Sequence, residues 1–436
     1  MSAEMMTVLF FGGLLAFLFL GAPLAFILGG LSAIFLYFTW GMDGFFMVSS
    51  RVWSTMGSFT LISIPLFVLM ALILERTGVA QALYRMMHLW MGGLRGGLAI
   101  GTVVICTIFA AMVGISGAAV VAMGTVALPA MLARGYDKEL ALGCINAGGG
   151  LGILIPPSVV MIIFSLNTGA SVGKLFAAGV MPGILLAVLV ALYISVRCLI
   201  QPRLGPALPR EERGGWKEKL LAVRSVLLPI VIVMMVLGSI LSGVATLTES
   251  AAMGVLGAIV SSLVHRTFSF AMLHEALVRT LRITAMIMWI FIGAHVFSTA
   301  YNAMGAQDLV MNLVSHLPGG AWGALAVMLA IVFVMGIVLD PVGIMLITLP
   351  IFMPIVNQHG IDPIWFGVLF VIMLEVGYMT PPFGFNLFYL RGVAPPEVTM
   401  GDIYRSVVPY TAVVLLGLLL IALFPQIALW LPGVLF

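Results

Sequence analysis

The sequence predicts an all-α polytopic membrane protein built from two inverted-topology repeats, each with a re-entrant helical hairpin and a broken transmembrane helix. Three observations lead to this fold class. The 436 residues are 62% hydrophobic and only 8% charged, whereas soluble domains carry about 25% charged residues. One pattern of glycines and a double proline occurs twice at a fixed spacing, and the basic residues gather on one side of the predicted spans.

The first copy of the pattern is GGGLGILIPPS at residues 148–158, inside an apolar run. Glycine adds backbone freedom, and proline lacks the N–H and clashes with the preceding turn, so we expect a helix to open there. Open backbone at bilayer depth is tolerated only where protein or a water-filled cavity satisfies its polar groups. Its carbonyl groups suit Na⁺ and its N–H groups suit a carboxylate.

The second copy is EVGYMTPPFG at residues 375–384, and its double proline follows the first one by 225 residues. The same spacing relates other pairs of identical residues: Gly29 and Gly254, Pro129 and Pro354, Asp137 and Asp362, Gly152 and Gly377. This constant spacing indicates a duplicated unit. We assign residues 1–200 to the first repeat, 201–225 to a polar linker and 226–436 to the second repeat.

The predicted elements follow in chain order. Residues 5–40 are too long for one span at about 1.5 Å per residue, so Gly21–Pro23 divides them into two helices. The other elements are an interfacial helix at 41–59, a span at 60–76, a basic amphipathic connection at 77–96, a hairpin at 97–134, a broken helix at 138–170, spans at 176–200, 226–244, 248–265 and 284–301, a hairpin at 322–357, a broken helix at 361–391 and a last span from about 408. Residues 97–134 also suit two full spans, but a hairpin carries its tip, GISG, to the depth of the break.

The distribution of basic residues predicts the topology. Five spans per repeat invert the second copy, and this parity places 17 Lys and Arg residues on one side and only Arg51 and Lys174 on the other. The positive-inside rule then puts the linker in the cytoplasm and both termini outside. Because no basic residue precedes the first apolar run, we expect a retained span rather than a cleaved signal peptide.

The composition and motifs exclude several function classes. The chain has no Walker A motif, no H-E-x-x-H and no G-x-S-x-G, so we expect neither ATP use nor enzymatic activity. The three cysteines lie singly in apolar segments and match no disulfide framework or metal pattern. Nucleic-acid binding by the basic linker is not needed, because the positive-inside bias explains its charge. Paired broken helices indicate a secondary transporter with its site near the midplane.

Each predicted hairpin tip faces a predicted break, and together they supply oxygen ligands for a monovalent cation. The first candidate Na⁺ site comprises Ser116, Gly149, Gly152 and Pro156; close helix packing is the alternative role for the serine and glycines. The second comprises Gly343, Gly377, Thr380 and Pro381. Asp340 lies at the second tip, where an acid is expensive and by default functional. It either neutralises Na⁺, carries a proton, faces a cationic substrate group, or only caps the helix that starts at Pro341.

Polar residues around the breaks are candidates for substrate binding. Ser158, Asn167 and Thr168 follow the first break and have hydrogen-bonding groups for substrate; local structural hydrogen bonds are the alternative. Glu375 precedes the second break, and we interpret it as a buried hydrogen-bond partner of the broken helix. Glu249 is expected to serve the N-terminus of its helix.

Four motifs carry a resemblance to a known family. They are GAPLAFILGG (21–30), GGGLGILIPPS (148–158), GKLFAAGVMPG (173–183) and TPPFGFNLF (380–388). The chain resembles, over essentially its whole length, the large membrane subunit of TRAP transporters, the tripartite ATP-independent periplasmic transporters.

The resemblance implies an elevator mechanism and Na⁺-driven uptake of organic acids across the bacterial inner membrane, with both termini periplasmic. It implies two partners, a small four-span membrane subunit on a separate polypeptide and a soluble periplasmic substrate-binding protein, and no cofactor beyond the coupling Na⁺. The family's two Na⁺ sites map onto the two sets named above, and its second-half acid onto Asp340. The competing hypothesis is a self-sufficient Na⁺- or H⁺-coupled dicarboxylate or citrate symporter of similar architecture.

Overall fold

The computed structural model describes residues 3–114, 116–209, 214–316 and 318–436. In this part of the chain the regular structure is helical, with no residue in a β-strand. The helices of the first half are α1 (Ala3–Phe19), α2 (Leu24–Phe26), η1 (Ile27–Leu31), α3 (Ser32–Trp40), α4 (Met42–Met56), η2 (Phe59–Ile62), α5 (Ser63–Arg76), α6 (Val79–Met91), α7 (Gly97–Val113), α8 (Ser116–Ala133), α9 (Lys138–Gly150), η3 (Leu151–Ile153), α10 (Val159–Thr168) and α11 (Val172–Ile200).

The second half follows a short 3-10 turn, η4 (Pro202–Leu204), and repeats this order with fewer interruptions. Its helices are α12 (Trp216–Leu241), α13 (Leu247–Val264), α14 (Phe270–Ala303), α15 (Ala306–Ser315), α16 (Gly320–Val338), α17 (Pro341–Gln358), α18 (Pro363–Tyr378), α19 (Phe385–Val393), α20 (Met400–Leu423) and α21 (Gln426–Leu435). The predicted division of residues 5–40 is confirmed, because α1 ends at Phe19 and the next helix starts after Pro23. Gly21 makes this turn with a left-handed φ of 74°, which glycine adopts at no steric cost.

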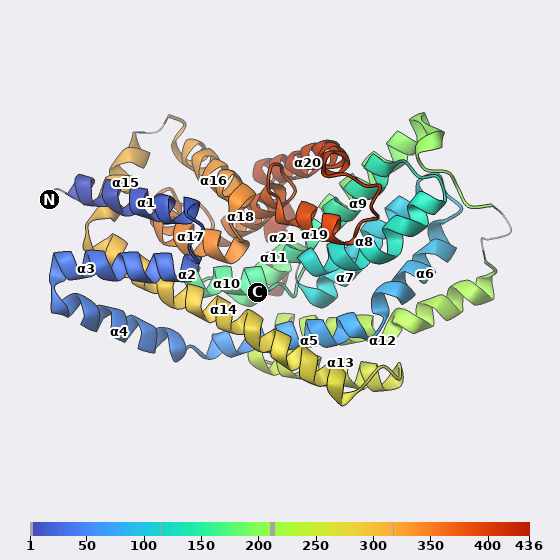
Figure 1. The fold of residues 1–436 in the computed structure, drawn as a ribbon, viewed down its shortest axis with the longest axis horizontal. Helices are drawn as coiled ribbons and strands as arrows, with labels where there is room; N and C mark the ends of the chain where they lie inside the picture. Colours follow the sequence, from blue (N-terminus) through green and yellow to red (C-terminus); the bar gives the residue numbers. More distant parts are fainter. Residues whose placement is uncertain (1–2, 115, 210–213, 317) are drawn as a thin grey trace.

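The helices form two packed groups (Figure 1). We call α2–α5 and α12–α14 the frame helices: α5 packs against α13 and α14, and α14 also packs against α3 and α4. We call α7–α11 and α16–α21 the inner helices: α9 packs against α7, α8 and α20, and α16 packs against α18. In Figure 1 the frame helices run along the lower and left sides, and the inner helices lie above them.

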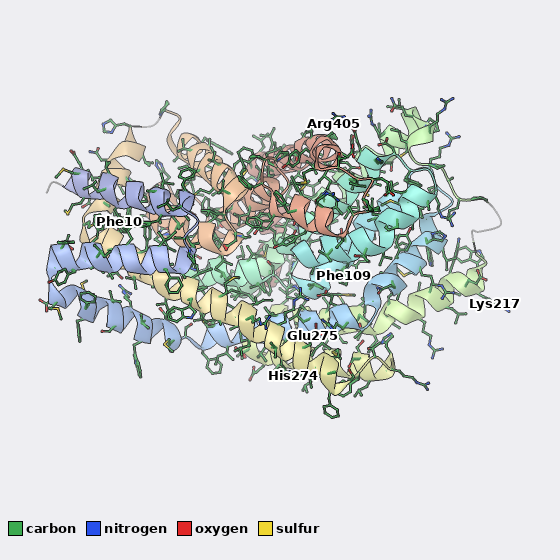
Figure 2. The ribbon with its side chains drawn as sticks, in the orientation of Figure 1. Phe10, Phe109, Lys217, His274, Glu275 and Arg405 are labelled. Carbon is green, nitrogen blue, oxygen red and sulfur yellow. The ribbon has the colours of Figure 1, made fainter. Side chains whose placement is uncertain are left out.

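The surface and the helix lengths fit a protein embedded in lipid. Eight described helices are long and apolar enough to cross a membrane, and α12, which bends by 45°, makes a ninth when it is counted whole. Large apolar side chains are also exposed on the shorter apolar helices, among them Phe19 of α1 at 88% and Phe38 of α3 at 81%. Exposed apolar surface on this scale marks contact with lipid or protein. Lys217 lies at one end of the molecule, far from Phe10 (Figure 2).

Three helices begin about eight or more residues earlier than the sequence indicated, because each has a first segment with charged residues that lies outside the apolar run. Helix α12 starts at Trp216, inside the predicted linker, where the N–H of Gly215 donates to Glu218. Helix α14 starts at Phe270 rather than 284, and α20 starts at Met400 rather than about 408. Ser269 and a Thr399–Asp402 capping box begin these two helices, as the capping preferences of serine and threonine favour.

The two predicted hairpins correspond to the helix pairs α7–α8 and α16–α17. The first pair turns at Gly114, where φ is 65°, and at Ile115, which lies outside the described residues. The second pair turns at Leu339 and Asp340, and α17 starts at Pro341. That the hairpins return to their own side of the membrane stays a prediction.

Candidate functional site

The first broken helix opens later than predicted. Helix α9 continues through all three glycines and ends at Gly150, so the prediction that the glycines interrupt it is wrong. Their role is close packing: a Cβ on Gly149 would lie 2.3 Å from a methyl of Val120, and one on Gly148 would lie 2.8 Å from the Cβ of Cys106. Glycine therefore lets α7 and α8 approach α9, as small residues do in membrane helix packing.

The first break itself comprises η3 and residues 154–158. Its two prolines, Pro156 and Pro157, are buried and joined by a cis peptide bond, and Gly152 lies in η3. The Ser158 hydroxyl donates to the Ile153 carbonyl at 2.6 Å and accepts the Met161 N–H at 3.3 Å. Ser158 is thus the N-cap of α10 and spans the break with its own side chain. This is the local structural role that was the alternative to substrate binding.

The first hairpin tip lies against this break. A Cβ on Gly114 would lie 2.4 Å from the carbonyl oxygen of Pro157, so only glycine permits this approach. The next described residue, Ser116, is buried, and its hydroxyl donates to the side-chain oxygen of Asn386 at 2.8 Å. Asn386 belongs to α19, the helix that follows the second break. The first tip therefore touches both broken helices.

The second break lies between Tyr378, the last residue of α18, and Phe385, the first of α19. The Thr380 hydroxyl donates to the Val376 carbonyl at 2.7 Å. The peptide bond between Pro381 and its following proline is cis, as in the first break. Unlike the buried first break, this one reaches the surface, because Pro382 and Phe383 are exposed.

The second hairpin approaches α18 near this break through two glycines. A Cβ on Gly377 would lie 2.7 Å from the Cα of Gly336, which places the backbones of α16 and α18 in direct contact. At the tip, the Asp340 carboxylate accepts the N–H of Gly343 at 2.7 Å. Asp340 is the N-cap of α17, so the capping role is observed.

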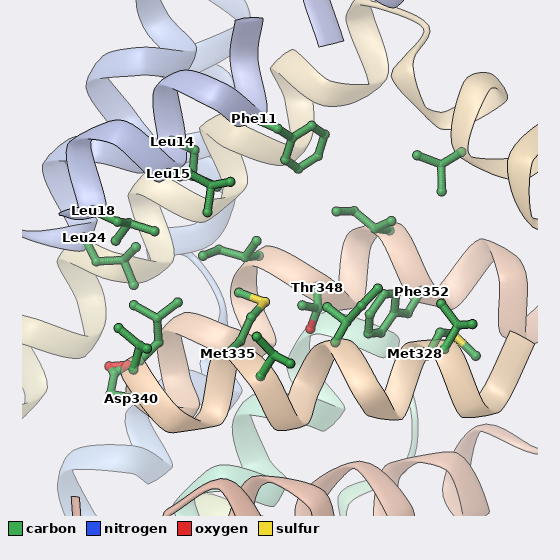
Figure 3. Close-up of a pocket in the computed structure, with 18 of the residues that line it drawn as sticks. Phe11, Leu14, Leu15, Leu18, Leu24, Met328, Met335, Asp340, Thr348 and Phe352 are labelled. Atoms are coloured by element: carbon green, nitrogen blue, oxygen red, sulfur yellow. The ribbon is translucent and has the colours of Figure 1, made fainter. Parts of the chain in front are cut away.

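Asp340 also lines a cavity of about 730 Å³. Figure 3 shows the carboxylate at one end and apolar side chains of α1 and the second hairpin, such as Phe11 and Met335, along the rest. Thr348 and Phe385 add to its lining. Asp340 supplies a carboxylate to a space that is otherwise lined by apolar side chains and Thr348, and that extends from α1 to the start of α19.

The structure does not bring all the predicted substrate-binding residues together. Asn167 and Thr168 lie at the far end of α10, where their side chains donate to the carbonyls of Ile163 at 2.8 Å and Phe164 at 2.9 Å. Nine or ten residues of helix place them about 14 Å along the axis from Ser158. These two side chains therefore belong to the end of α10 rather than to the break.

Glu375 does not make the hydrogen bonds that we expected from the sequence. Glu375 is fully buried, and neither carboxylate oxygen has a hydrogen-bond partner among the described residues. It therefore does not serve the broken helix as a hydrogen-bond partner in this structure. Its side chain occupies the space that Gly150 leaves open, since a Cβ there would lie 2.7 Å from Oε1. By contrast, Glu249 caps α13 with Thr246, as expected.

Sequence reasoning missed the residues that join the first tip to α19. A Cβ on Gly117 would lie 2.7 Å from the Tyr389 ring, and Ser116 bonds to Asn386. Asn386 follows the double proline by four residues, and this nearness was the available signal. Its pairing with Ser116 across 270 residues depends on how the two halves pack.

The arrangement provides backbone and hydroxyl oxygens in a buried setting. In the described ranges no group of three or more His, Cys, Asp or Glu side chains is placed to hold a metal ion. The Ser116 hydroxyl and the Asp340 carboxylate lie at the two tips, and the Thr380 hydroxyl and backbone carbonyls lie at the breaks. Such oxygens suit a hard monovalent cation and can also bind polar parts of a small solute.

A family model described as the DctM component of the tripartite ATP-independent periplasmic transporter matches residues 11–427. The chain is similar to the C4-dicarboxylate TRAP transporter large permease protein DctM of Pseudomonas aeruginosa, with 34% identity over 405 residues and 93% of each chain covered. It is 32% identical over 378 residues to the ectoine TRAP transporter large permease protein TeaC of Halomonas elongata, covering 86% of this chain and 87% of that one. Among solved structures, the Alcanivorax borkumensis YdaH transporter has a TM-score of 0.59 at 14% identity over 98% of both chains, a likeness of fold alone.

Proposed function

Because the chain belongs to the family of TRAP transporter large membrane subunits, we propose that it imports small organic acids across the inner membrane with a Na⁺ gradient as the driving force. The observation that carries this proposal is the packing of each hairpin on a broken helix, with Gly114 against Pro157 and Gly336 against Gly377. These contacts bring open backbone together with the buried Ser116 hydroxyl at the first place and lie close in sequence to the half-buried Thr380 hydroxyl at the second. Secondary transporters bind substrate and coupling ions at such broken helices.

The two Na⁺ sites are proposed at these contacts. The first comprises Ser116, Gly149, Gly152 and Pro156, and the second comprises Gly343, Gly377, Thr380 and Pro381. Asp340, at the second tip, faces the cavity between α1 and the hairpin and is the proposed substrate-side acid. Both sites lie within the inner helices.

The inverted repeats are supported by the order and length of the helices. When the bounds of α8 (116–133) are shifted by the 225 residues that separate the double prolines, they become 341–358, the bounds of α17. The inner helices contain both hairpins and both broken helices, and the frame helices contain neither. We therefore propose that the inner helices move as an elevator against the frame helices, with both termini periplasmic and the 201–215 segment in the cytoplasm.

The proposed substrates are organic acids such as C4-dicarboxylates, which the name of the Pseudomonas aeruginosa relative includes. The proposed partners are a small four-span membrane subunit and a soluble periplasmic binding protein that delivers substrate. The exposed apolar side chains of the frame helices, including Phe38 and Trp53, supply surface for the membrane partner and for lipid.

The test is transport in proteoliposomes that contain this chain and the small subunit. Radiolabelled succinate uptake is measured with and without an inward Na⁺ gradient and with and without the binding protein. We expect uptake only when Na⁺ and the binding protein are both present. Uptake without the binding protein would support the self-sufficient symporter instead. Uptake that does not depend on the Na⁺ gradient would refute the coupling of transport to Na⁺.

A further inference from the structure

The two helices that follow the breaks differ in the hydrogen-bond partners of the N–H groups in their first turns. At the first break Ser158 caps α10, and its hydroxyl accepts an N–H of the first turn. At the second break the N-cap of α19 is Gly384, which provides no side-chain cap. The residue 225 positions after Ser158 is Phe383, which has no hydroxyl group and is 54% exposed. In the first turn of α19 the Leu387 N–H donates to the Gly384 carbonyl at 2.8 Å, and the N–H groups of Phe385 and Asn386 are left without a capping side chain. These N–H groups carry the positive end of the helix dipole.

A second, independent feature lies in the same turn. Asn386 is fully buried, and its side-chain oxygen accepts the Ser116 hydroxyl at 2.8 Å. Its side-chain nitrogen has no hydrogen-bond partner among the described residues. A buried amide nitrogen without an acceptor is unfavourable, so a ligand that accepts a hydrogen bond from it is favoured. The corresponding position in the first repeat is Met161, which has no such donor.

From these two features we propose that the N-terminus of α19 is a carboxylate-binding site, with the Asn386 side-chain nitrogen donating to the substrate carboxylate. Ser116 fixes the amide by occupying its oxygen, which leaves the nitrogen available. The start of α10 is not such a site, because Ser158 already satisfies it. The inference rests on the proposed transport of organic acids, and it names the helix that recognises them.

The start of α19 can be reached from outside the packed helices. Pro382 and Phe383 are exposed, so the break opens to the surface directly before this helix. Phe385, its first residue, lines the cavity that contains Asp340. The Asp340 carboxylate is engaged by the N–H of Gly343 at the start of another helix, so it does not satisfy the start of α19.

The test is carboxylate binding to the purified full chain, measured by thermal stabilisation and by the succinate KM in proteoliposomes. Asn386→Asp keeps the side-chain size, removes the amide N–H donors and adds a negative charge. We expect apparent succinate affinity to fall by about 10- to 100-fold, as for a lost hydrogen bond to a charged group, while stabilisation by Na⁺ alone persists. Asn357→Asp, at an exposed position near the end of α17, is the matched control and should change neither.

A second variant tests the site without touching the amide. Phe383→Ser places a serine where the first repeat has Ser158, so that its hydroxyl caps α19 and competes with the ligand. We expect stability to be maintained and succinate affinity to fall, while succinamide, which has no carboxylate, stabilises neither wild type nor variant.

The outcomes separate this inference from the proposed function. Unchanged succinate affinity in both variants would overturn the site and leave organic-acid transport standing. A wild type that responds to Na⁺ but not to succinate would refute both the substrate class and the carboxylate site. A wild type that responds to succinate but not to Na⁺ would refute only the coupling.

Discussion

Replacing Asp340 by asparagine separates its charge from its capping role. The carboxylate accepts the Gly343 N–H at 2.7 Å and caps α17. Asparagine is about as good an N-cap as aspartate, whereas alanine costs about 0.5–2 kcal/mol, and loss of the charge at the helix N-terminus costs about 0.3–1 kcal/mol. We therefore expect Asp340→Asn to lower the free energy of unfolding by less than about 1 kcal/mol, and Asp340→Ala by about 1–2 kcal/mol.

Transport should respond in a different way. Asp340 is the acid of an otherwise apolar cavity, so a role in binding substrate or balancing ion charge requires the negative charge itself. We expect Asp340→Asn to lower Na⁺-driven uptake by about tenfold or more, since interactions with a charged group contribute about 1.5–3 kcal/mol.

The measurements are thermal unfolding in detergent and succinate uptake in proteoliposomes at matched protein content. The control is Asp362→Asn, because Asp362 caps α18 through the N–H groups of Ile364 and Trp365 and lies outside the proposed site. The control should transport normally. Near-normal uptake by Asp340→Asn, together with destabilised Asp340→Ala, would show that Asp340 is a helix cap and nothing more.

Three further predictions follow from contacts and topology. Gly377→Ala places a Cβ 2.7 Å from the Gly336 backbone, so we expect about 1–3 kcal/mol of destabilisation by overpacking and loss of uptake; an unchanged melting temperature would contradict the close crossing. Ser116→Ala leaves Asn386 without its partner and should cost about 1–3 kcal/mol, and normal stability would refute the bond's importance. Cysteines introduced at Ala207 and at the C-terminus should react with impermeant reagents from the cytoplasmic and periplasmic faces respectively, and reaction of both from one face would refute the proposed parity.

The sequence predicted the helix interruptions better than the helix starts. Double prolines end a helix by a local steric rule, so the breaks near Pro156 and Pro381 were predictable. The same local reasoning failed for Gly148–Gly150, because tertiary packing against Val120 and Cys106 outweighs the low helix propensity of glycine. Helix α12 began inside the predicted linker because hydropathy does not detect a charged first turn.

The candidate site was predictable where it depends on local chain chemistry and not where it depends on the packing of the two halves. Asp340 could be found because an isolated acid in an apolar hairpin is conspicuous. Asn386 could not be assigned, since its partner Ser116 lies 270 residues away. Asn167 and Thr168 were chosen for nearness in sequence, and the length of α10 carries them away from the break.

Helix α14 has a further consequence for the outline of the molecule. Its 34 residues extend about 51 Å, whereas the hydrocarbon layer is about 30 Å thick. Residues 283–303 account for about 31 Å and carry no charged side chain, while Glu275, Arg279 and Arg282 all lie in the first 13 residues of the helix. This charged part is about 20 Å long, and with α14 along the membrane normal it would lie beyond the lipid on the proposed cytoplasmic side.

An ion pair holds the charged part of α14 against α5. Arg76, the last residue of α5, forms a bidentate ion pair with Glu275, so the end of α5 is tied to the charged part of α14. Helix α14 is thus longer than a span along the membrane normal requires. If the inner helices move along the frame helices, α14 would stay beside them during the inward movement. The length of α14 would then limit how far the inner helices can move.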